Sequence, residues 1–215
     1  MRSKEEETIN AYTHFLWGVL SLTFLLFFLI DSNISLKFKA SSLLMVGLSS
    51  WTFFSSYLYH SSVGKKKNYN REIDKTSIYL MITGSGVSIN LGTVDSTTAA
   101  ISSIFLIVLG ASLTAIYALK KNTSEAFSLT SYILLGWFCI FPITGLIGKN
   151  AYQESMPFGL ILLGGLLYTI GIFYYARDSI KWNHTKWHIF VMGGYAAHLL
   201  AHYKVVSNTA LIAGV

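Results

Sequence analysis

Seven long apolar runs separated by short polar segments are the feature that most constrains the fold of this chain. The runs cover residues 11–30, 40–59, 76–94, 96–119, 126–148, 156–176 and 184–203. Each has about the 20 residues that a helix needs to cross a bilayer. Because an open sheet edge cannot be placed in hydrocarbon, the runs predict helices and not strands. We therefore expect one domain, residues 1–215, that is an all-α integral membrane bundle of seven transmembrane helices.

The composition excludes the main alternatives to a membrane protein. Hydrophobic residues make up 53% of the chain and charged residues only 12%, whereas a soluble domain carries about 25% charged residues. An ordinary soluble enzyme and a disordered chain are both excluded. The residues before the first run lack the short apolar core and small-residue cleavage site of a signal peptide. We expect the first run to be retained as a span.

Lysine and arginine residues predict the orientation of the bundle. Twelve of the 16 fall on the N-terminal side of the predicted membrane: Arg2, Lys4, Lys65, Lys66, Lys67, Arg71, Lys75, Lys120, Lys121, Arg177, Lys181 and Lys186. The other side carries Lys37, Lys39, Lys149 and Lys204. Because cytoplasmic segments carry the positive excess, we expect the N-terminus in the cytoplasm and the C-terminus outside. The run Lys65–Lys67 is expected to contact anionic lipid headgroups and not nucleic acid.

Histidines are the candidate metal ligands, because Cys139 is the one cysteine and cannot build a cysteine site. His184 and His188 are one helical turn apart on one face, a spacing that suits two ligands of one ion. The alternative is interfacial imidazoles bonded to water or backbone. The second run ends at His60 on the same side of the membrane, so three histidines reach one depth. Three imidazoles leave the fourth position of a tetrahedral Zn²⁺ open for water, as in a catalytic site.

Two further polar residues fall at this level. Asp74 opens the third run and is a candidate to hold or deprotonate the water; the alternative is a carboxylate that caps a helix start. Ser56 precedes His60 by four residues, so it shares that face one turn deeper and is a candidate supporting residue.

The remaining histidines permit other interpretations. His198 and His202 form a second pair, but His198 lies roughly 21 Å along the helix from His184. We expect His198 to be buried and hydrogen-bonded, and His202 to be interfacial. His14 lies near the start of the first run. Three roles are open for it: a residue that supports the ligands, a fourth ligand, or an interfacial histidine.

Small residues and aromatic residues predict how the spans pack. The third run is rich in glycine and serine, which predicts a position inside the bundle. Glycines of the sixth and seventh runs predict close helix contacts, and Pro142 predicts a kink in the fifth. Trp187, Tyr174 and Tyr175 are expected to be interface anchors.

The residues singled out above resemble the motifs of the hemolysin III family, the bacterial branch of the progestin and adipoQ receptor superfamily. Ser56–His60 is similar to its serine-xxx-histidine motif, Asp74–Gly84 to the motif that opens its third span, and Asn10–His14 to its N-terminal signature. His184–His188 followed by His198 is similar to its seventh-span pattern. The resemblance implies a seven-helix protein of a bacterial inner (plasma) membrane. It also implies zinc held by His60, His184 and His188, with Asp74 holding water and Ser56 supporting the site.

The resemblance implies two functions of different kinds. The superfamily includes alkaline ceramidases and receptors with ceramidase-like activity, which implies zinc-dependent hydrolysis of a lipid amide, with a sphingolipid-like or other lipid substrate. The bacterial branch is named for hemolysis, which implies a pore-forming protein. Our leading hypothesis is the membrane hydrolase, with Asp74 as general base. The alternative is a non-enzymatic, zinc-stabilised receptor-like or pore-forming protein.

Overall fold

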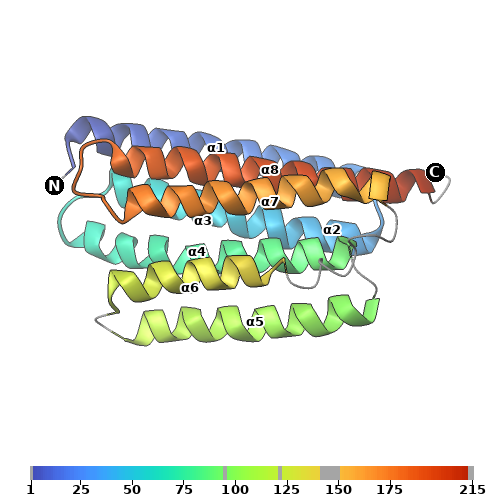
Figure 1. The fold of residues 1–215 in the computed structure, drawn as a ribbon. Coiled ribbons are helices and arrows are strands. Elements are labelled where there is room, and N and C mark those ends of the chain that lie inside the picture. The colour runs from blue at the N-terminus through green and yellow to red at the C-terminus, as the bar shows by residue number, and fades with distance from the viewer. Residues whose placement is uncertain (1, 94–95, 121–122, 141–150, 213–215) are drawn as a thin grey trace.

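The computed structural model describes residues 2–93, 96–120, 123–140 and 151–212, and these residues form an all-α bundle (Figure 1). The helices are α1 (Lys4–Ile30), α2 (Leu36–Ser42), the π-helical turn η1 (Leu43–Gly47), α3 (Leu48–Ser61), α4 (Gly64–Thr93), α5 (Ser96–Leu119), α6 (Glu125–Phe138), α7 (Ala151–Tyr175) and α8 (Asn183–Ile212). Because α2, η1 and α3 follow one another without a break, the described residues form seven helical rods. The expected all-α fold is confirmed.

The rods alternate in direction, so the two chain ends lie at opposite ends of the bundle (Figure 1). Several helices extend beyond the apolar runs: α1 begins at Lys4, α4 at Gly64, and α8 continues to Ile212. Residues 141–148 of the fifth predicted span, with Pro142, lie outside the described residues.

Helix α4 lies inside the bundle, as its small and hydroxylated residues predicted. Residues 84–90 are all buried. A Cβ atom at Gly84 would lie 2.7 Å from the carbonyl oxygen of Leu44, so only glycine lets α4 approach the η1 turn this closely. The hydroxyl of Ser88 donates to the carbonyl of Ser41 just before that turn. The irregular turn is therefore held by the helix that packs against it.

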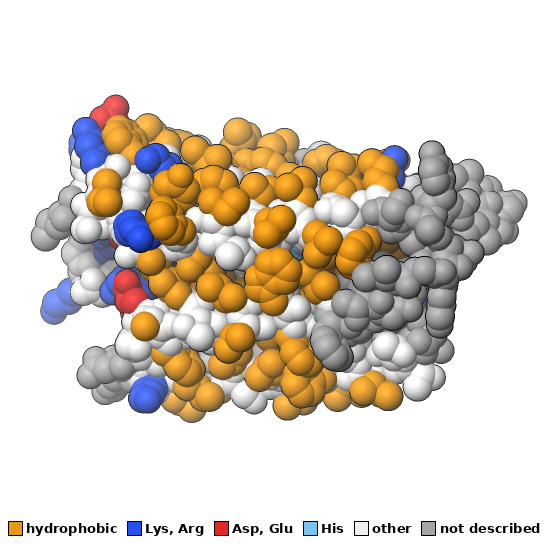
Figure 2. Space-filling model, in the orientation of Figure 1, with side chains coloured by type: hydrophobic (Ala, Val, Ile, Leu, Met, Phe, Trp, Pro, Cys, Tyr) orange, Lys and Arg blue, Asp and Glu red, His pale blue; other side chains and the backbone are white. Residues whose placement is uncertain are grey.

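The outward-facing surface is that of a membrane protein. Three described helical segments are long and apolar enough to cross a bilayer: Lys4–Ile30, Thr97–Leu119 and Met156–Tyr175. Figure 2 shows a broad hydrophobic band over one face, with Lys, Arg, Asp and Glu side chains gathered mainly at the N-terminal end. Large apolar side chains stand exposed on the bundle, such as Ile104 on α5 and Phe173 on α7. So much exposed apolar surface is unsuited to water and indicates an integral membrane protein.

The N-terminal turn of α1 is fastened to the loop between α7 and α8. Ser3 caps α1, and Glu6 completes the capping box by accepting from the Ser3 N–H. The second oxygen of Glu6 accepts a hydrogen bond from the N–H of Trp182. Trp182 has φ +68°, a left-handed conformation that is uncommon for a large side chain. This contact brings the two segments together at the histidine-bearing end of the bundle.

Candidate metal centre

Three histidines from two helices meet at the N-terminal end of the bundle. His60 lies in the last turn of α3, and His184 and His188 lie in the first two turns of α8. One nitrogen from each ring lies within 4.8 Å of the others, and all three residues are buried. The Nε2 atoms of His60 and His184 are 3.3 Å apart. The structure therefore brings together the three residues that the sequence nominated as metal ligands.

His14 forms a second layer behind this cluster. Its ring stacks on the ring of His188, with centroids 3.7 Å apart and planes 18° from parallel. Both ring nitrogens of His14 are buried and have no hydrogen-bond partner among the described residues. The interpretation of His14 as an interfacial histidine is therefore wrong, because its ring is buried against Phe53 and His188 inside the bundle.

Two carboxylates support the cluster from outside, and neither was predicted from the sequence. Glu7 Oε2 lies 2.7 Å from Nδ1 of His60 in a hydrogen bond. Asp178 Oδ1, from the α7–α8 loop, lies 3.1 Å from Nδ1 of His184, but off the axis that a hydrogen bond requires. The acidic triplet Glu5–Glu7 was a visible signal, but charge in the first turn of a helix is ordinarily explained by the helix dipole.

Arg2 joins the two carboxylates. Its guanidinium forms a two-pronged contact with Asp178 at 2.6 and 3.2 Å, and its Nη1 lies 3.4 Å from Glu7. Burial alone would raise the pKa of Glu7, but hydrogen bonds from His60 and Lys67 outweigh it and lower this pKa to about 2. Burial likewise opposes ionisation of Asp178, but contacts with His184 and Arg2 lower its pKa below the usual range. Both carboxylates are therefore ionised at neutral pH.

Asp74 and Ser56 lie on the inner side of the cluster. Both line an internal cavity, and the Ser56 hydroxyl interacts with the Asp74 carboxylate. The interpretation of Asp74 as a helix cap is wrong, because α4 begins ten residues earlier at Gly64. Asp74 is instead a helix-interior carboxylate that shares the cavity with His184 and His188.

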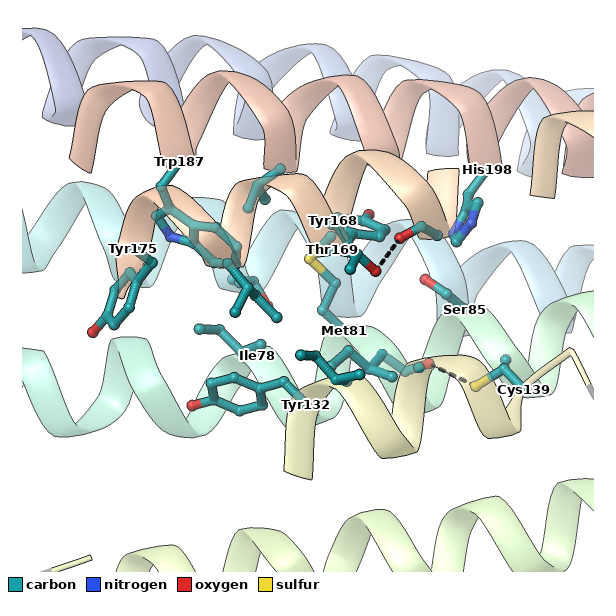
Figure 3. A pocket seen from close by; sticks show the side chains of 18 of the residues that line it. Ile78, Met81, Ser85, Tyr132, Cys139, Tyr168, Thr169, Tyr175, Trp187 and His198 are labelled. Carbon is teal, nitrogen blue, oxygen red and sulfur yellow. Dashed lines mark hydrogen bonds between the residues drawn. The ribbon is translucent and has the colours of Figure 1, made fainter. Parts of the chain in front are cut away.

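The cavity extends from this end along the bundle between α4, α6, α7 and α8. It has about 1130 Å³ of empty space, counting its mouth, and most of its lining is apolar. Figure 3 shows Tyr175 and Trp187 towards one end, Met81 and Thr169 in the middle, and Cys139 with His198 towards the other. His60 faces a separate polar recess, which Arg2, Glu7 and Asp178 also line. The histidine cluster thus lies between an apolar cavity and a polar recess.

Three other residues test the sequence-based expectations. His198 is partly buried and its Nε2 lies 3.1 Å from the carbonyl oxygen of Ile161, which confirms the expected hydrogen bond. The expectation that His202 is interfacial is wrong, because the residue is buried in the bundle and its Nε2 bonds to the Ser42 hydroxyl of α2 at 2.8 Å. Trp187 is not an interface anchor, because it is buried against the cavity.

The donor set fits a metal ion. Since a carboxylate only accepts, Glu7 requires the proton of neutral His60 on Nδ1, and Asp178 favours the same for His184. Both Nε2 atoms then present bare lone pairs to each other at 3.3 Å. Two nitrogen ligands at about 2.0–2.1 Å from a tetrahedral ion stand about 3.3–3.4 Å apart. A cation between these lone pairs would turn a repulsive contact into two ligand bonds.

A bundle of long apolar helices with a buried three-histidine cluster at one end defines an integral membrane protein with a candidate metal centre. The model of the family described as "Haemolysin-III related" matches residues 2–199, and the chain belongs to this family. It is similar to "Hemolysin-3 homolog" of Bacillus subtilis (strain 168), at 32% identity over 198 residues that cover 90% of this chain and 91% of the relative. It is also similar to "Hemolysin-3" of Bacillus cereus, at 28% identity over 204 residues, 89% and 88% of the two chains. The family expected from the motifs is confirmed.

Proposed function

We propose that this protein is a zinc-dependent membrane hydrolase that cleaves a lipid amide or ester. One observation carries the proposal: a single, mostly apolar cavity brings Asp74 and Ser56 to the same end as His184 and His188. Reactive polar groups at one end of an apolar space suit a substrate with a long hydrocarbon chain and a polar bond to be cleaved. An ordinary membrane bundle has no need to bury these ionisable groups together.

The residues have distinct roles in this reaction. His60, His184 and His188 would hold the ion, which when bound supplies a Lewis acid for the carbonyl and for a nucleophilic water. Asp74 acts as the general base that accepts the proton of the attacking water. Ser56 orients the Asp74 carboxylate through its hydroxyl. The apolar lining holds the acyl chain, and the polar recess at His60 gives water a route to the cluster.

Hydrolysis by an Asp74→Asn variant tests the proposal. Asparagine keeps the size of the side chain but cannot accept the proton, and a general base contributes about 10²–10⁴-fold to a rate. We expect Asp74→Asn to keep its bound metal and to lose at least about 100-fold in fatty acid released from ceramides or phospholipids, measured by mass spectrometry. Exposed Glu72→Gln, half a helical turn away, is the matched control and should keep full activity.

Two outcomes decide against the hydrolase. Full activity of Asp74→Asn removes the general-base role. Metal-loaded wild-type protein that releases no fatty acid from either lipid class contradicts the hydrolase itself. In that case the alternative gains weight: a metal that ties α3 to α8 in a receptor-like or pore-forming protein. Ion flux through liposomes that contain the protein, without turnover, would identify the pore.

A further inference from the structure

The three histidines are held in place by different neighbours, but the surroundings of His60 and His184 are alike. Each of these two rings has a carboxylate at Nδ1 and directs Nε2 toward the other ring. Among the described residues, Nδ1 of His188 has no hydrogen-bond partner, and the ring is instead stacked on His14. The two carboxylates come from segments far apart in the chain, the first turns of α1 and the α7–α8 loop.

We propose that Glu7 and Asp178, joined by Arg2, are positioning residues that set the metal affinity of the histidine cluster. Each carboxylate holds the proton on Nδ1 of its histidine, which leaves Nε2 free to bind a cation and fixes the direction of the ring. The inference rests on metal binding at His60, His184 and His188, and it holds whether or not the protein hydrolyses a lipid.

Arg2 is the link that makes two separate contacts into one unit. Nε and Nη2 of its planar guanidinium donate to the two carboxylate oxygens of Asp178. The remaining nitrogen, Nη1, donates both to Glu7 and to the Tyr59 hydroxyl. Without this cation, two ionised carboxylates would face each other across a partly buried recess. The charge of Arg2 lets both stay close to the imidazoles.

Glu6 explains why Asp178 can reach His184 at all. It completes the cap of α1 and also holds the N–H of Trp182, so the N-terminal turn and the α7–α8 loop share two fastening points. Asp178 lies four residues before Trp182 in the same loop, so the contact of Glu6 with Trp182 also fixes the place of Asp178. Orientation of the second ring therefore depends on residues that touch neither histidine.

The two contacts differ in quality, and this difference predicts an order of effects. Glu7 makes an aligned hydrogen bond to His60 at 2.7 Å, whereas Asp178 approaches His184 off axis at 3.1 Å. Loss of a carboxylate partner of a metal-ligating histidine typically lowers metal affinity by about 10–100-fold. We expect Glu7→Ala near the upper end of that range, and Glu7→Gln and Asp178→Asn nearer the lower end. Glutamine retains an acceptor but not the charge.

Metal affinity of the purified, full-length protein is the decisive measurement. Zn²⁺ affinity is obtained by competition with a chromophoric chelator, and the ligand-field spectrum of bound Co²⁺ reports the geometry of the nitrogen ligands. Exposed Glu5→Gln, from the same acidic triplet, is the matched control and should bind as wild type does. Arg2→Ala should weaken binding as Asp178→Asn does. A purely structural role would lower the unfolding temperature of the metal-free protein and leave the affinity and the Co²⁺ spectrum of folded protein unchanged.

The result that overturns the proposal is specific. If Glu7→Gln and Asp178→Asn both bind Zn²⁺ within twofold of wild type with an unchanged Co²⁺ spectrum, the carboxylates do not position the ligands. These conservative variants decide the matter if Glu7→Ala does not fold. A wild-type protein that binds neither ion also overturns it. Lost affinity with no lipid hydrolysis in any variant would support the inference and contradict the proposed function, so the two stand or fall separately.

Discussion

Single histidines of this chain take different roles because their surroundings differ, although their spacing is alike. The pairs His184 with His188 and His198 with His202 are both four residues apart on α8. The first pair meets a third histidine from α3. The second pair meets single polar partners, the Ile161 carbonyl and the Ser42 hydroxyl. A histidine with one hydrogen-bond partner stabilises a contact between helices, whereas a cluster of three can hold an ion.

The bond between Ser42 and His202 is testable at this scale. Ser42→Ala removes the partner of a buried imidazole nitrogen, which should cost about 1–3 kcal/mol of folding free energy. We expect a lower unfolding temperature in detergent, measured by the change in intrinsic tryptophan fluorescence. Ser112→Ala is the matched control, because that exposed hydroxyl donates to the Val108 carbonyl of its own helix and its loss should have little effect. An equal stability of both variants would show that the interhelical bond contributes nothing.

Pairs of helices approach closely where glycine replaces a side chain. Helices α7 and α8 pack along each other, and a Cβ atom at Gly171 would lie 2.8 Å from the Trp187 ring. A Cβ at Gly164 would collide with the ring of His198, which its bond to the Ile161 carbonyl holds in place. The close contacts predicted from the glycines of the sixth run are therefore made, at specific positions.

Alanine substitution separates the packing role of Gly164 from helix propensity. Gly164→Ala should destabilise the bundle by about 1–3 kcal/mol, because the added methyl overpacks the contact with α8. A Cβ atom at Gly159, on the same helix, would meet no atom of the described residues within 4 Å. Gly159→Ala should be neutral or stabilise the protein by up to about 1 kcal/mol, since alanine is the better helix former. Thermal unfolding in detergent compares them, and a neutral Gly164→Ala would contradict the tight contact.

The whole molecule has one charged end, and this asymmetry bears on its orientation. The described Lys and Arg side chains gather mainly at the end that holds the N-terminus and the histidine cluster (Figure 2). The positive-inside rule favours that end in the cytoplasm. The candidate metal centre would then open through its polar recess to the cytoplasm, while the cavity extends toward the other side.

Thiol labelling tests the orientation directly, because the chain has a single cysteine, Cys139, to replace. In a Cys139→Ser background, exposed Ser32→Cys lies in the loop after α1, and exposed Lys66→Cys lies near the start of α4. We expect a membrane-impermeant maleimide to label Ser32→Cys in intact cells and Lys66→Cys only after permeabilisation. The reverse pattern would place the N-terminus outside.

Much of the fold could be predicted, because a membrane helix is recognisable from the apolar residues of its own segment. An apolar run of sufficient length must satisfy its backbone hydrogen bonds within itself, so the approximate position of each helix follows from the chain alone. The three-histidine cluster was also predictable, because alternating spans bring His60 and His184 to one end. The ends of the helices were less predictable. Helices α1 and α4 include the polar segments Lys4–Asn10 and Gly64–Lys75, which hydropathy alone would leave outside the helices.

The sequence by itself determined the class of protein, the order of its helices, its family and the three histidines. Only the tertiary structure decided what surrounds those histidines. It identified Glu7 and Asp178 as their partners, Arg2 as the link between the carboxylates, and a buried place for His202. The physical reason is that span formation depends on neighbouring residues along the chain, whereas partners of an imidazole are set by side chains that meet only when distant helices pack.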